Sequence, residues 1–305
     1  MISIANTDLK VHPLCLGGNV FGWSADEANS FAVLSHFVDH GGNFIDTADM
    51  YSQWGEGHIG GESETIIGKW MRSRGNRSSV VIATKVAKLD TRPGLSAKNI
   101  KAACDDSLRR LQTDYIDLYY AHQDDPDTPI EETLQAFDSL VKAGKVRHIA
   151  ASNFTAERLT SSLEISAKSG LARYLAAQDH YNLLERGYES SLRPTLEKYG
   201  LAQIPYFGLA RGFLTGKYRP GATVESVRAA GVAAYQNDRG WTLLKALDEI
   251  ASHHHTSVAS VALAWLRAQP TVAAPIASAR NIEQLAEFMP IVQLSSEELQ
   301  TLTNS

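Results

Sequence analysis

Short apolar runs alternate along the chain with longer segments in which apolar residues recur every three or four positions. Short runs rich in β-branched and aromatic residues are typical of strands, and the longer spacing is typical of helices with one buried face. The predicted strands are residues 14–18, 43–47, 80–85, 115–122, 146–152, 174–178, 204–208 and 271–276. The regular alternation of strand and helix predicts an α/β fold with a parallel sheet.

Four of the intervening segments carry the clearest helical pattern: residues 26–41, 63–73, 96–111 and 129–144. The last has Pro129 at its start, acidic residues in the first turn and Gly144 at its end. Proline suits the first turn of a helix and glycine suits the residue after the last turn. This segment therefore has clear signals for both ends of a helix.

Eight strand-helix units in 305 residues match the size of a (β/α)8 TIM barrel, and we expect one domain spanning residues 1–305. A doubly wound open sheet is the alternative. Its usual sign is a G-x-G-x-x-G motif after the first strand, but this chain has glycines at positions 17, 18 and 22, with no helix directly after them. The pattern favours the barrel.

Two predicted loops, residues 50–61 and 208 to about 237, are longer than the others. Both follow the carboxyl ends of predicted strands, where barrel enzymes build their active sites. Long loops in compact domains are usually functional. We therefore expect both loops to contribute to a site at this end of the barrel.

Composition restricts the function further. The chain is 44% hydrophobic and carries a formal net charge of −5, with its basic residues scattered, so a nucleic-acid-binding surface is not expected. No apolar run is long enough to cross a membrane and the first ten residues do not resemble a secretion signal, so a cytoplasmic location is expected. Cys15 and Cys104 are predicted to be buried thiols without a disulfide or metal role.

Polar residues of complementary chemistry lie where three consecutive strands are predicted to end. Asp46, Lys85 and His122 occupy these positions, and Tyr51 lies on the loop that follows Asp46. Asp46 would hold Lys85 in place, His122 would orient a substrate oxygen, and Lys85 is expected to lower the pKa of Tyr51. The set suits protonation of a developing alkoxide. Taken singly, each residue could equally be a turn cap, a solvated lysine or a structural histidine.

Metal chemistry is not expected. Three consecutive histidines, residues 253–255, invite a metal hypothesis, but adjacent side chains in a helix point about 100° apart and do not easily share one ion. We interpret the run as a solvated helix end. The acids in residues 122–129 are interpreted as a capped loop before a helix.

The sequence resembles the aldo-keto reductase family over almost its whole length. The motifs that carry the resemblance are LCLGGNVFG, NFIDTADMYS, GGESETIIGKW, ATK, YIDLYYAHQDDPDTPIEETLQAFDSLVKAGKVRHIAASNF, YNLLER, LARGFLTGKYR and PIASARNIEQL. Several motifs in one order are far more specific than any one alone. The resemblance implies a (β/α)8 barrel that reduces aldehydes or ketones with NADPH, with NADH as the alternative cofactor.

The same resemblance implies a catalytic tetrad of Asp46, Tyr51, Lys85 and His122. It also implies three cofactor contacts: Ser152, Asn153 and Gln178 on the carboxamide, Tyr206 stacked on the nicotinamide, and Arg280 facing the 2′-phosphate. The full set of expected cofactor-binding residues is Gly17, Gly18, Asn19, Asp46, Ser152, Asn153, Gln178, Tyr206, Phe207, Gly208, Leu209, Arg211, Gly212, Lys217, Ser278, Arg280, Gln284 and Glu287. Trp23 and Trp54, with Tyr51 and His122, are expected to bind the substrate.

The chain departs from the family pattern at four places: Gly18 replaces a more usual threonine, Phe207-Gly208 replaces Ser-Pro, Ser278 replaces glycine and Phe288 replaces asparagine. Two other functions are compatible with the motifs. One is a regulatory or sensor barrel that binds NADPH with little turnover, and the other is a Schiff-base aldolase that uses Lys85. The physiological carbonyl compound and the oligomeric state do not follow from the sequence.

Overall fold

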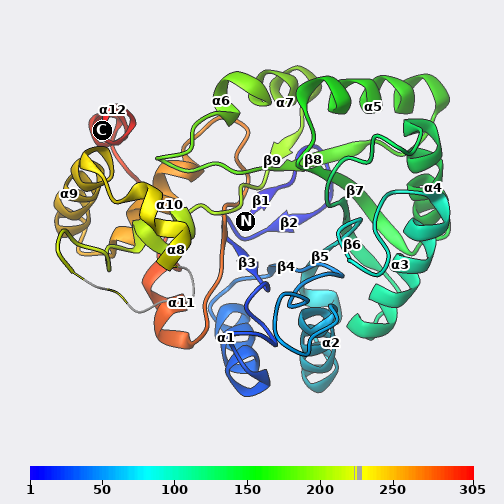
Figure 1. Cartoon of the computed structure of the whole chain (residues 1–305), viewed down its shortest axis with the longest axis horizontal. Helices are drawn as coiled ribbons and strands as arrows, with labels where there is room; N and C mark the ends of the chain where they lie inside the picture. Colours follow the sequence, from blue (N-terminus) through cyan, green and yellow to red (C-terminus); the bar gives the residue numbers. More distant parts are fainter. Residues whose placement is uncertain (223, 225–228) are drawn as a thin grey trace.

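The computed structural model describes residues 1–222, 224 and 229–305. Its centre is a sheet of eight parallel strands in the order β10-β3-β4-β5-β6-β7-β8-β9. The strands are β3 (Cys15–Gly17), β4 (Phe44–Asp46), β5 (Val81–Val86), β6 (Ile116–Ala121), β7 (Val146–Ser152), β8 (Tyr174–Gln178), β9 (Ala202–Gln203) and β10 (Ile276–Ala277). The sheet curls into the predicted (β/α)8 barrel (Figure 1).

Helices surround the strands in Figure 1. They are α1 (Glu27–Asp39), α2 (Glu62–Arg74), α3 (Ala97–Leu111), α4 (Ile130–Lys142), α5 (Ala156–Ser169), α6 (Tyr188–Ser191), α7 (Arg193–Tyr199), α8 (Ala229–Val232), α9 (Asp238–His253), α10 (Val258–Arg267), α11 (Ile282–Phe288) and α12 (Ser296–Asn304), with 3-10 turns η1 (Arg77–Ser79), η2 (Ala210–Thr215) and η3 (Ala233–Tyr235). Within the described residues, no helix has both the length and the apolar character needed to cross a bilayer.

The four helices with the clearest sequence pattern are confirmed as α1 to α4, within one or two residues at each end. Pro129 is the N-cap of α4, and Gly144, just beyond the C-cap, has a φ of 72°. Glycine adopts that left-handed conformation without the steric penalty that a Cβ atom would bring. Pro129 and Gly144 therefore mark the start and the end of α4, as predicted from the sequence.

Alternation along each strand divides the buried side chains into two cores. Phe44, Leu118 and Tyr120 point into the barrel, whereas Ile45 and Tyr119 pack between the sheet and the helices. Successive side chains of a strand face opposite sides, so residues two apart share one side. The interior core is small and the helix-side core is the larger of the two.

The same alternation carries polar residues into the mouth of the barrel. Asp46 lies two residues after Phe44, Lys85 two after Ala83, and His122 two after Tyr120. Ser152 and Gln178 end β7 and β8 in the same way. Each strand is thus apolar inside the barrel and polar at its last inward position. This pattern builds the site at the carboxyl ends of the strands.

A two-stranded antiparallel ribbon that the sequence pattern did not predict lies across the centre of the ring in Figure 1. It consists of β1 (Ile2–Ser3) and β2 (Lys10–Val11). Val11 is fully buried and joins the interior core, so the ribbon closes the amino-terminal end of the barrel. An ion pair of 2.6 Å between Asp8 and Arg147 at the start of β7 helps to hold it.

Two predicted strands are misplaced. The segment 204–208 was predicted as a strand, but β9 lies just before it, because Pro205 lacks the N–H that a regular ladder requires. The segment 271–276 forms a strand only at its end. Thr271 has a φ of 69° and Pro275 again lacks an N–H. Only Ile276 and Ala277 are therefore in register with β3.

The two long loops lie at the predicted end of the barrel. The first joins β4 to α2, and the second runs from β9 to α9 and contains η2, α8 and η3. Residues 223 and 225–228 of the predicted 208–237 loop lie outside the described residues. The described part of this loop packs against α10 through η2. Both loops contribute residues to the cavity described below.

The histidine run contacts the last helix through one carboxylate. His253 Nδ1 and His254 Nε2 lie 3.2 and 2.9 Å from the same Oε1 atom of Glu298. The prediction that adjacent histidines diverge here was wrong, because α9 ends at His253 and the 100° spacing stops there. The other carboxylate oxygen of Glu298 accepts the N–H of Ser295, completing a capping box for α12. Glu298 therefore fastens α12 to the end of α9.

We expect Glu298→Gln to destabilise the protein at neutral pH and progressively less in acid. Burial opposes ionisation, but hydrogen bonds from Ser295 and the two histidines outweigh it and lower the pKa of Glu298 from 4.5 to about 2. A depressed pKa stabilises the fold above the unfolded value and loses that contribution as pH falls through the window from 4.5 to about 2. The measurement is the thermal unfolding midpoint of both proteins across that window.

The neighbouring Glu297→Gln is the matched control, because Glu297 is exposed and makes no hydrogen bond through its side chain in the described structure. A difference between wild type and Glu298→Gln that stays constant down to the lower end of the window would contradict this account.

Candidate active site

A fully buried lysine organises the mouth of the barrel. Lys85 Nζ donates to Asp46 Oδ2 at 2.6 Å, to the Thr47 carbonyl oxygen at 2.7 Å and to the Tyr51 hydroxyl oxygen at 2.9 Å. An ammonium group has three N–H donors, so all of them are used. The lysine is therefore fixed in position and has no N–H left for another partner.

Asp46 connects this lysine to the rest of the site. Its Oδ2 atom also accepts from the Tyr51 hydroxyl at 3.2 Å, and its Oδ1 atom accepts from Gln178 Nε2 at 3.0 Å. Asp46 is 1% exposed and Lys85 is 0% exposed, so the pair is shielded from water. Buried charges are tolerated when each has a partner and its remaining hydrogen-bonding groups are satisfied. The arrangement around Asp46 and Lys85 meets that condition.

The surroundings keep the Tyr51 hydroxyl protonated. Burial raises the pKa of Tyr51 well above its usual value near 10, and the Asp46 carboxylate raises it further. The prediction that Lys85 sets this pKa to a lower value was wrong in direction, because the loss of water and the negative charge outweigh the ammonium group. Burial also lowers the pKa of Lys85, and Asp46 opposes that change. Tyr51 therefore carries its proton at neutral pH.

His122 lies beside Tyr51, with 6.0 Å between the ring centroids and an angle of 72° between the ring planes. Burial lowers the pKa of His122 well below 6.5, and the charges of Lys85 and Lys88 lower it further. The imidazole is thus neutral at neutral pH and carries one N–H. Tyr51 and His122 lie beside each other in the lining of one cavity.

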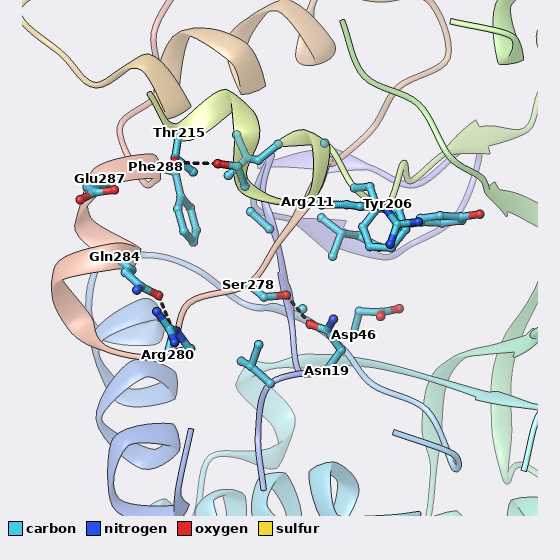
Figure 2. A pocket seen from close by; sticks show the side chains of 18 of the residues that line it. Asn19, Asp46, Tyr206, Arg211, Thr215, Ser278, Arg280, Gln284, Glu287 and Phe288 are labelled. Carbon is cyan, nitrogen blue, oxygen red and sulfur yellow. Dashed lines mark hydrogen bonds between the residues drawn. The ribbon is translucent and has the colours of Figure 1, made fainter. Parts of the chain in front are cut away.

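A cavity of about 970 Å³ opens beside this network. Asp46 lies on one side of it and Gln284, Glu287 and Phe288 of α11 on the other (Figure 2). Tyr51, His122 and residues from η2 also line it. The predicted cofactor-binding residues that line it are Gly17, Asn19, Asp46, Ser152, Asn153, Gln178, Tyr206, Phe207, Gly208, Leu209, Arg211, Gly212, Lys217, Ser278, Arg280, Gln284 and Glu287. Gly18 is outside this lining, and its N–H donates to the Asp46 carbonyl oxygen at 2.7 Å.

Amide groups and an aromatic ring meet next to the tetrad. Asn153 Nδ2 donates to the His122 carbonyl oxygen at 2.9 Å, and Tyr206 donates from its hydroxyl to Asn153 Oδ1 at 2.8 Å. His180 stacks on the ring of Tyr206, with 5.6 Å between centroids and 16° between planes. His180 therefore supports the Tyr206 ring, and this ring lines the cavity. Its fixed orientation suits stacking on a flat ligand ring.

The segment that follows Tyr206 has an unusual backbone. Ala210, Arg211 and Gly212 have φ values of 47°, 58° and 102° in succession. Residues other than glycine rarely adopt positive φ, and such strained conformations cluster at ligand-binding segments. The Arg211 guanidinium lies 4.2 Å from the centroid of the Phe207 ring, which holds the segment in a tight turn. Strain at these positions supports a binding role for this segment.

Residues that end or follow β3 and β10 meet beside Asp46 (Figure 2). Ser278 Oγ donates to Asn19 Oδ1 at 2.6 Å, and a Cβ atom on Gly17 would lie 2.5 Å from Ser278 Oγ. Gly17 thus leaves room for the serine that replaces the usual family glycine. On α11, Gln284 Oε1 accepts from the Arg280 backbone N–H at 3.0 Å, and the side chains of these residues face the cavity.

The two predicted substrate-binding tryptophans occupy different places. Trp54 lines the cavity and is 44% exposed at its mouth. Trp23 is outside the lining and packs edge to face on Trp54, with 5.7 Å between centroids. Trp54 also lies 6.0 Å from the Tyr51 ring. The exposed aromatic surface next to the tetrad is therefore that of Trp54, with Trp23 as its support.

Several lining residues were missed by the sequence reasoning: Val20, Ser24, Lys88, Thr215, Gly216, Asp248, Ala251, Ser252, Thr256, Ser257, Val258, Ile276 and Ala277. Asp248, Ala251 and Ser252 belong to α9 and Val258 to α10, and their contribution depends on helix packing that no motif marks. Lys88 is different, because it lies just beyond a strand that already supplies a tetrad residue. Charge at the end of a barrel strand was the signal that could have identified it.

Comparisons with known proteins agree with this geometry. The model of the Aldo/keto reductase family matches residues 13–305. The chain is 34% identical to the uncharacterized oxidoreductase YrpG of Bacillus subtilis, over 96% of this chain and 90% of that protein. It is 33% identical to norsolorinic acid reductase stcV of Emericella nidulans (95% and 77%) and to a probable voltage-gated potassium channel subunit beta of Oryza sativa subsp. japonica (94% and 89%).

Proposed function

The chain belongs to the aldo/keto reductase family of oxidoreductases, and we propose that it reduces the carbonyl group of an aldehyde or ketone to an alcohol with NADPH. The observation that carries the proposal is the buried network in which Lys85 and Asp46 fix the hydroxyl of Tyr51 at the edge of a large cavity. A phenol held in this way is suited to donate a proton to an oxygen atom bound in the cavity.

The chain's own residues divide the chemistry between them. A substrate oxygen between Tyr51 and His122 would accept one hydrogen bond from each side chain. The Tyr51 proton then moves to this oxygen as negative charge develops on it, and the phenolate that forms is stabilised by the Lys85 ammonium group. His122, being neutral, orients the oxygen without adding charge. When bound, the reduced nicotinamide supplies the hydride that the carbonyl carbon receives.

The cavity fits a dinucleotide in three respects. Asn153 and Gln178 place amide groups near the tetrad, the ring of Tyr206 is supported for stacking, and strained backbone follows it. At the far end, Arg280 and Gln284 line the cavity. We propose that the carboxamide lies at the first set and the adenosine end at the second. Lys217 and Arg211, between these ends, suit the pyrophosphate by charge.

Arg280→Gln is expected to weaken NADPH binding by roughly 10- to 100-fold while weakening NADH binding much less. The reason is that a guanidinium group would pair with the 2′-phosphate, which NADH lacks. Dissociation constants of both cofactors, measured by quenching of tryptophan fluorescence, give the ratio directly. Arg72→Gln removes an exposed arginine far from the cavity and serves as the control. Equal losses for NADPH and NADH would remove Arg280 from the proposed phosphate site.

The test of the proposed activity is the loss of NADPH absorbance with an activated aromatic aldehyde, run beside a measurement of NADPH binding. Consumption of NADPH with formation of the alcohol supports the reductase. Binding without turnover across a panel of aldehydes and ketones would contradict it and favour the second candidate.

That second candidate is a regulatory or sensor barrel. Its support is the similarity to a probable voltage-gated potassium channel subunit beta over 94% of this chain. The intact Asp46–Lys85–Tyr51 network speaks for turnover, because a binding protein has no need for a proton donor held in this way. A Schiff-base aldolase is disfavoured on different grounds. All three N–H groups of Lys85 are used, and borohydride should trap no adduct on it.

A further inference from the structure

We propose that the carbonyl substrate carries a carboxylate group and that Lys88 binds it. The inference rests on the proposed reductase function and specifies its substrate class. Lys88 lines the same cavity as Tyr51, Trp54 and His122, but belongs neither to the tetrad nor to the segments assigned to the cofactor. It would therefore act as a specificity residue for the part of the substrate that extends away from the reacting carbonyl.

The position of Lys88 is fixed relative to the proton donor. It lies two residues beyond the end of β5, and its carbonyl oxygen accepts from Gln53 Nε2 at 3.3 Å. Gln53 Oε1 in turn accepts the backbone N–H of Asp90 at 3.2 Å. Because Gln53 is two residues after Tyr51, these bonds join the loop of the proton donor to the loop of Lys88. The lysine is held at the substrate end of the cavity.

The ammonium group of Lys88 lacks an acidic partner. Among the described residues, no carboxylate oxygen lies within 4.0 Å of it, although the side chain is half-buried. A lysine ordinarily points its charge into water or pairs it when buried. Here burial and the charge of Lys85 lower the pKa of Lys88. An anion entering the cavity would relieve both unfavourable effects.

The other cations that line the described cavity have different places. Arg211 and Lys217 belong to the strained segment and its continuation, and Arg280 precedes α11. These three match the phosphates of a dinucleotide. Lys88 instead follows β5, the strand of Lys85, and its charge contributes to the lowered pKa of His122. One positive charge, close enough to act on His122, is therefore left over after the cofactor has been placed.

Trp54 indicates the shape of the substrate. Its exposed ring is a flat apolar surface close to Tyr51, and Gln53, which precedes it in the sequence, is hydrogen-bonded to the Lys88 carbonyl oxygen. Both Trp54 and Lys88 line the cavity. A substrate with an aromatic or other apolar body, a carbonyl at one end and a carboxylate at the other would contact all three groups. 4-Carboxybenzaldehyde has this form. Its methyl ester, methyl 4-formylbenzoate, has nearly the same shape without the charge.

The experiment compares kcat/KM for these two aldehydes in the wild type and in Lys88→Gln. We expect the wild type to favour the acid, and Lys88→Gln to lower the acid-to-ester ratio about tenfold, as a charge-assisted contact at a partly buried site predicts. Using the ratio cancels any general loss of activity. Lys88→Arg should retain most of the ratio. Lys98→Gln, which removes the same charge from an exposed position on α3, should leave the ratio at the wild-type value.

A binding measurement separates this inference from the reductase proposal. Dissociation constants of benzoate and neutral benzamide, followed by tryptophan fluorescence in the presence of NADP⁺, do not depend on turnover. If the wild type prefers benzoate and Lys88→Gln abolishes that preference, the carboxylate site is supported. This holds even if neither aldehyde is reduced, because the absence of reduction would overturn only the reductase proposal. If both aldehydes are reduced but Lys88→Gln does not change the acid-to-ester ratio of kcat/KM, the role of Lys88 is overturned. The reductase proposal would still be supported.

Discussion

Tyr51→Phe is expected to lower kcat for carbonyl reduction by roughly 10²- to 10⁴-fold, the range that a positioned general acid supplies. The substitution removes the proton that the substrate oxygen would receive and keeps the aromatic ring. Lys85 stays bound to Asp46 and Thr47 inside the barrel, and the N–H that loses the hydroxyl is separated from the substrate oxygen by the space the hydroxyl occupied. Neutral His122 can orient the oxygen but remains a weaker acid in this position. The measurement is the rate of NADPH oxidation at saturating aldehyde.

The control for Tyr51→Phe is cofactor binding. The hydroxyl contacts Asp46 and Lys85 and is one of many groups that line the cavity, so the NADPH dissociation constant should change little. A variant that binds NADPH normally and keeps most of its turnover would refute the assignment of Tyr51 as the acid. Loss of both binding and turnover would instead indicate that the hydroxyl shapes the cavity.

Lys85→Met is expected to destabilise the fold by about 3 to 5 kcal/mol, the usual effect of removing one member of a buried ion pair. Methionine fills similar space but leaves the Asp46 carboxylate, 1% exposed, without its cation. The Thr47 carbonyl oxygen also loses its donor. Turnover should be lost together with stability, because the phenolate of Tyr51 would have no neighbouring ammonium group. Chemical denaturation of both proteins gives the difference in unfolding free energy.

The double variant Asp46→Leu with Lys85→Met separates stability from catalysis. Replacing both members of a buried pair by apolar residues is often neutral or stabilising, so most of the lost stability should return. Activity should not return. If Lys85→Met alone proved as stable as the wild type, Asp46 would have to be neutral or hydrated in the barrel, and the described network could not hold as stated.

The meeting of Asp46 and Lys85 was predictable from sequence because two simple periodicities coincide. Alternation along a strand places Asp46 on the same side as Phe44, and strand order places its neighbour Lys85 beside it. Neither inference requires knowledge of side-chain contacts. The (β/α)8 fold followed from the same alternation applied to eight units. Helices α1 to α4 were predicted well because their caps are encoded locally.

Other features depend on contacts between distant segments and could not be read from the pattern. The β1–β2 ribbon consists of two-residue strands whose role comes from packing inside the barrel. Strand β10 is shortened by Thr271 and Pro275, whose effect depends on backbone geometry. The pKa of Tyr51 was predicted in the wrong direction because its burial, unlike its charged neighbours, is not visible in the sequence. Lys88 was overlooked because no motif marks it.

The barrel pairs β3 with β10, two strands that are synthesised far apart in time. Cys15 pairs with Ile276 and Leu16 with Ala277, and the Ser278 hydroxyl reaches Asn19. A growing chain that has not yet reached Ile276 would expose β3 as an open sheet edge, which is prone to pairing with other chains. It would also lack Arg280 and the whole of α11. The proposed dinucleotide site thus comes into existence only after residues 276–288 have been synthesised, and capture of the cofactor would report that the barrel is complete.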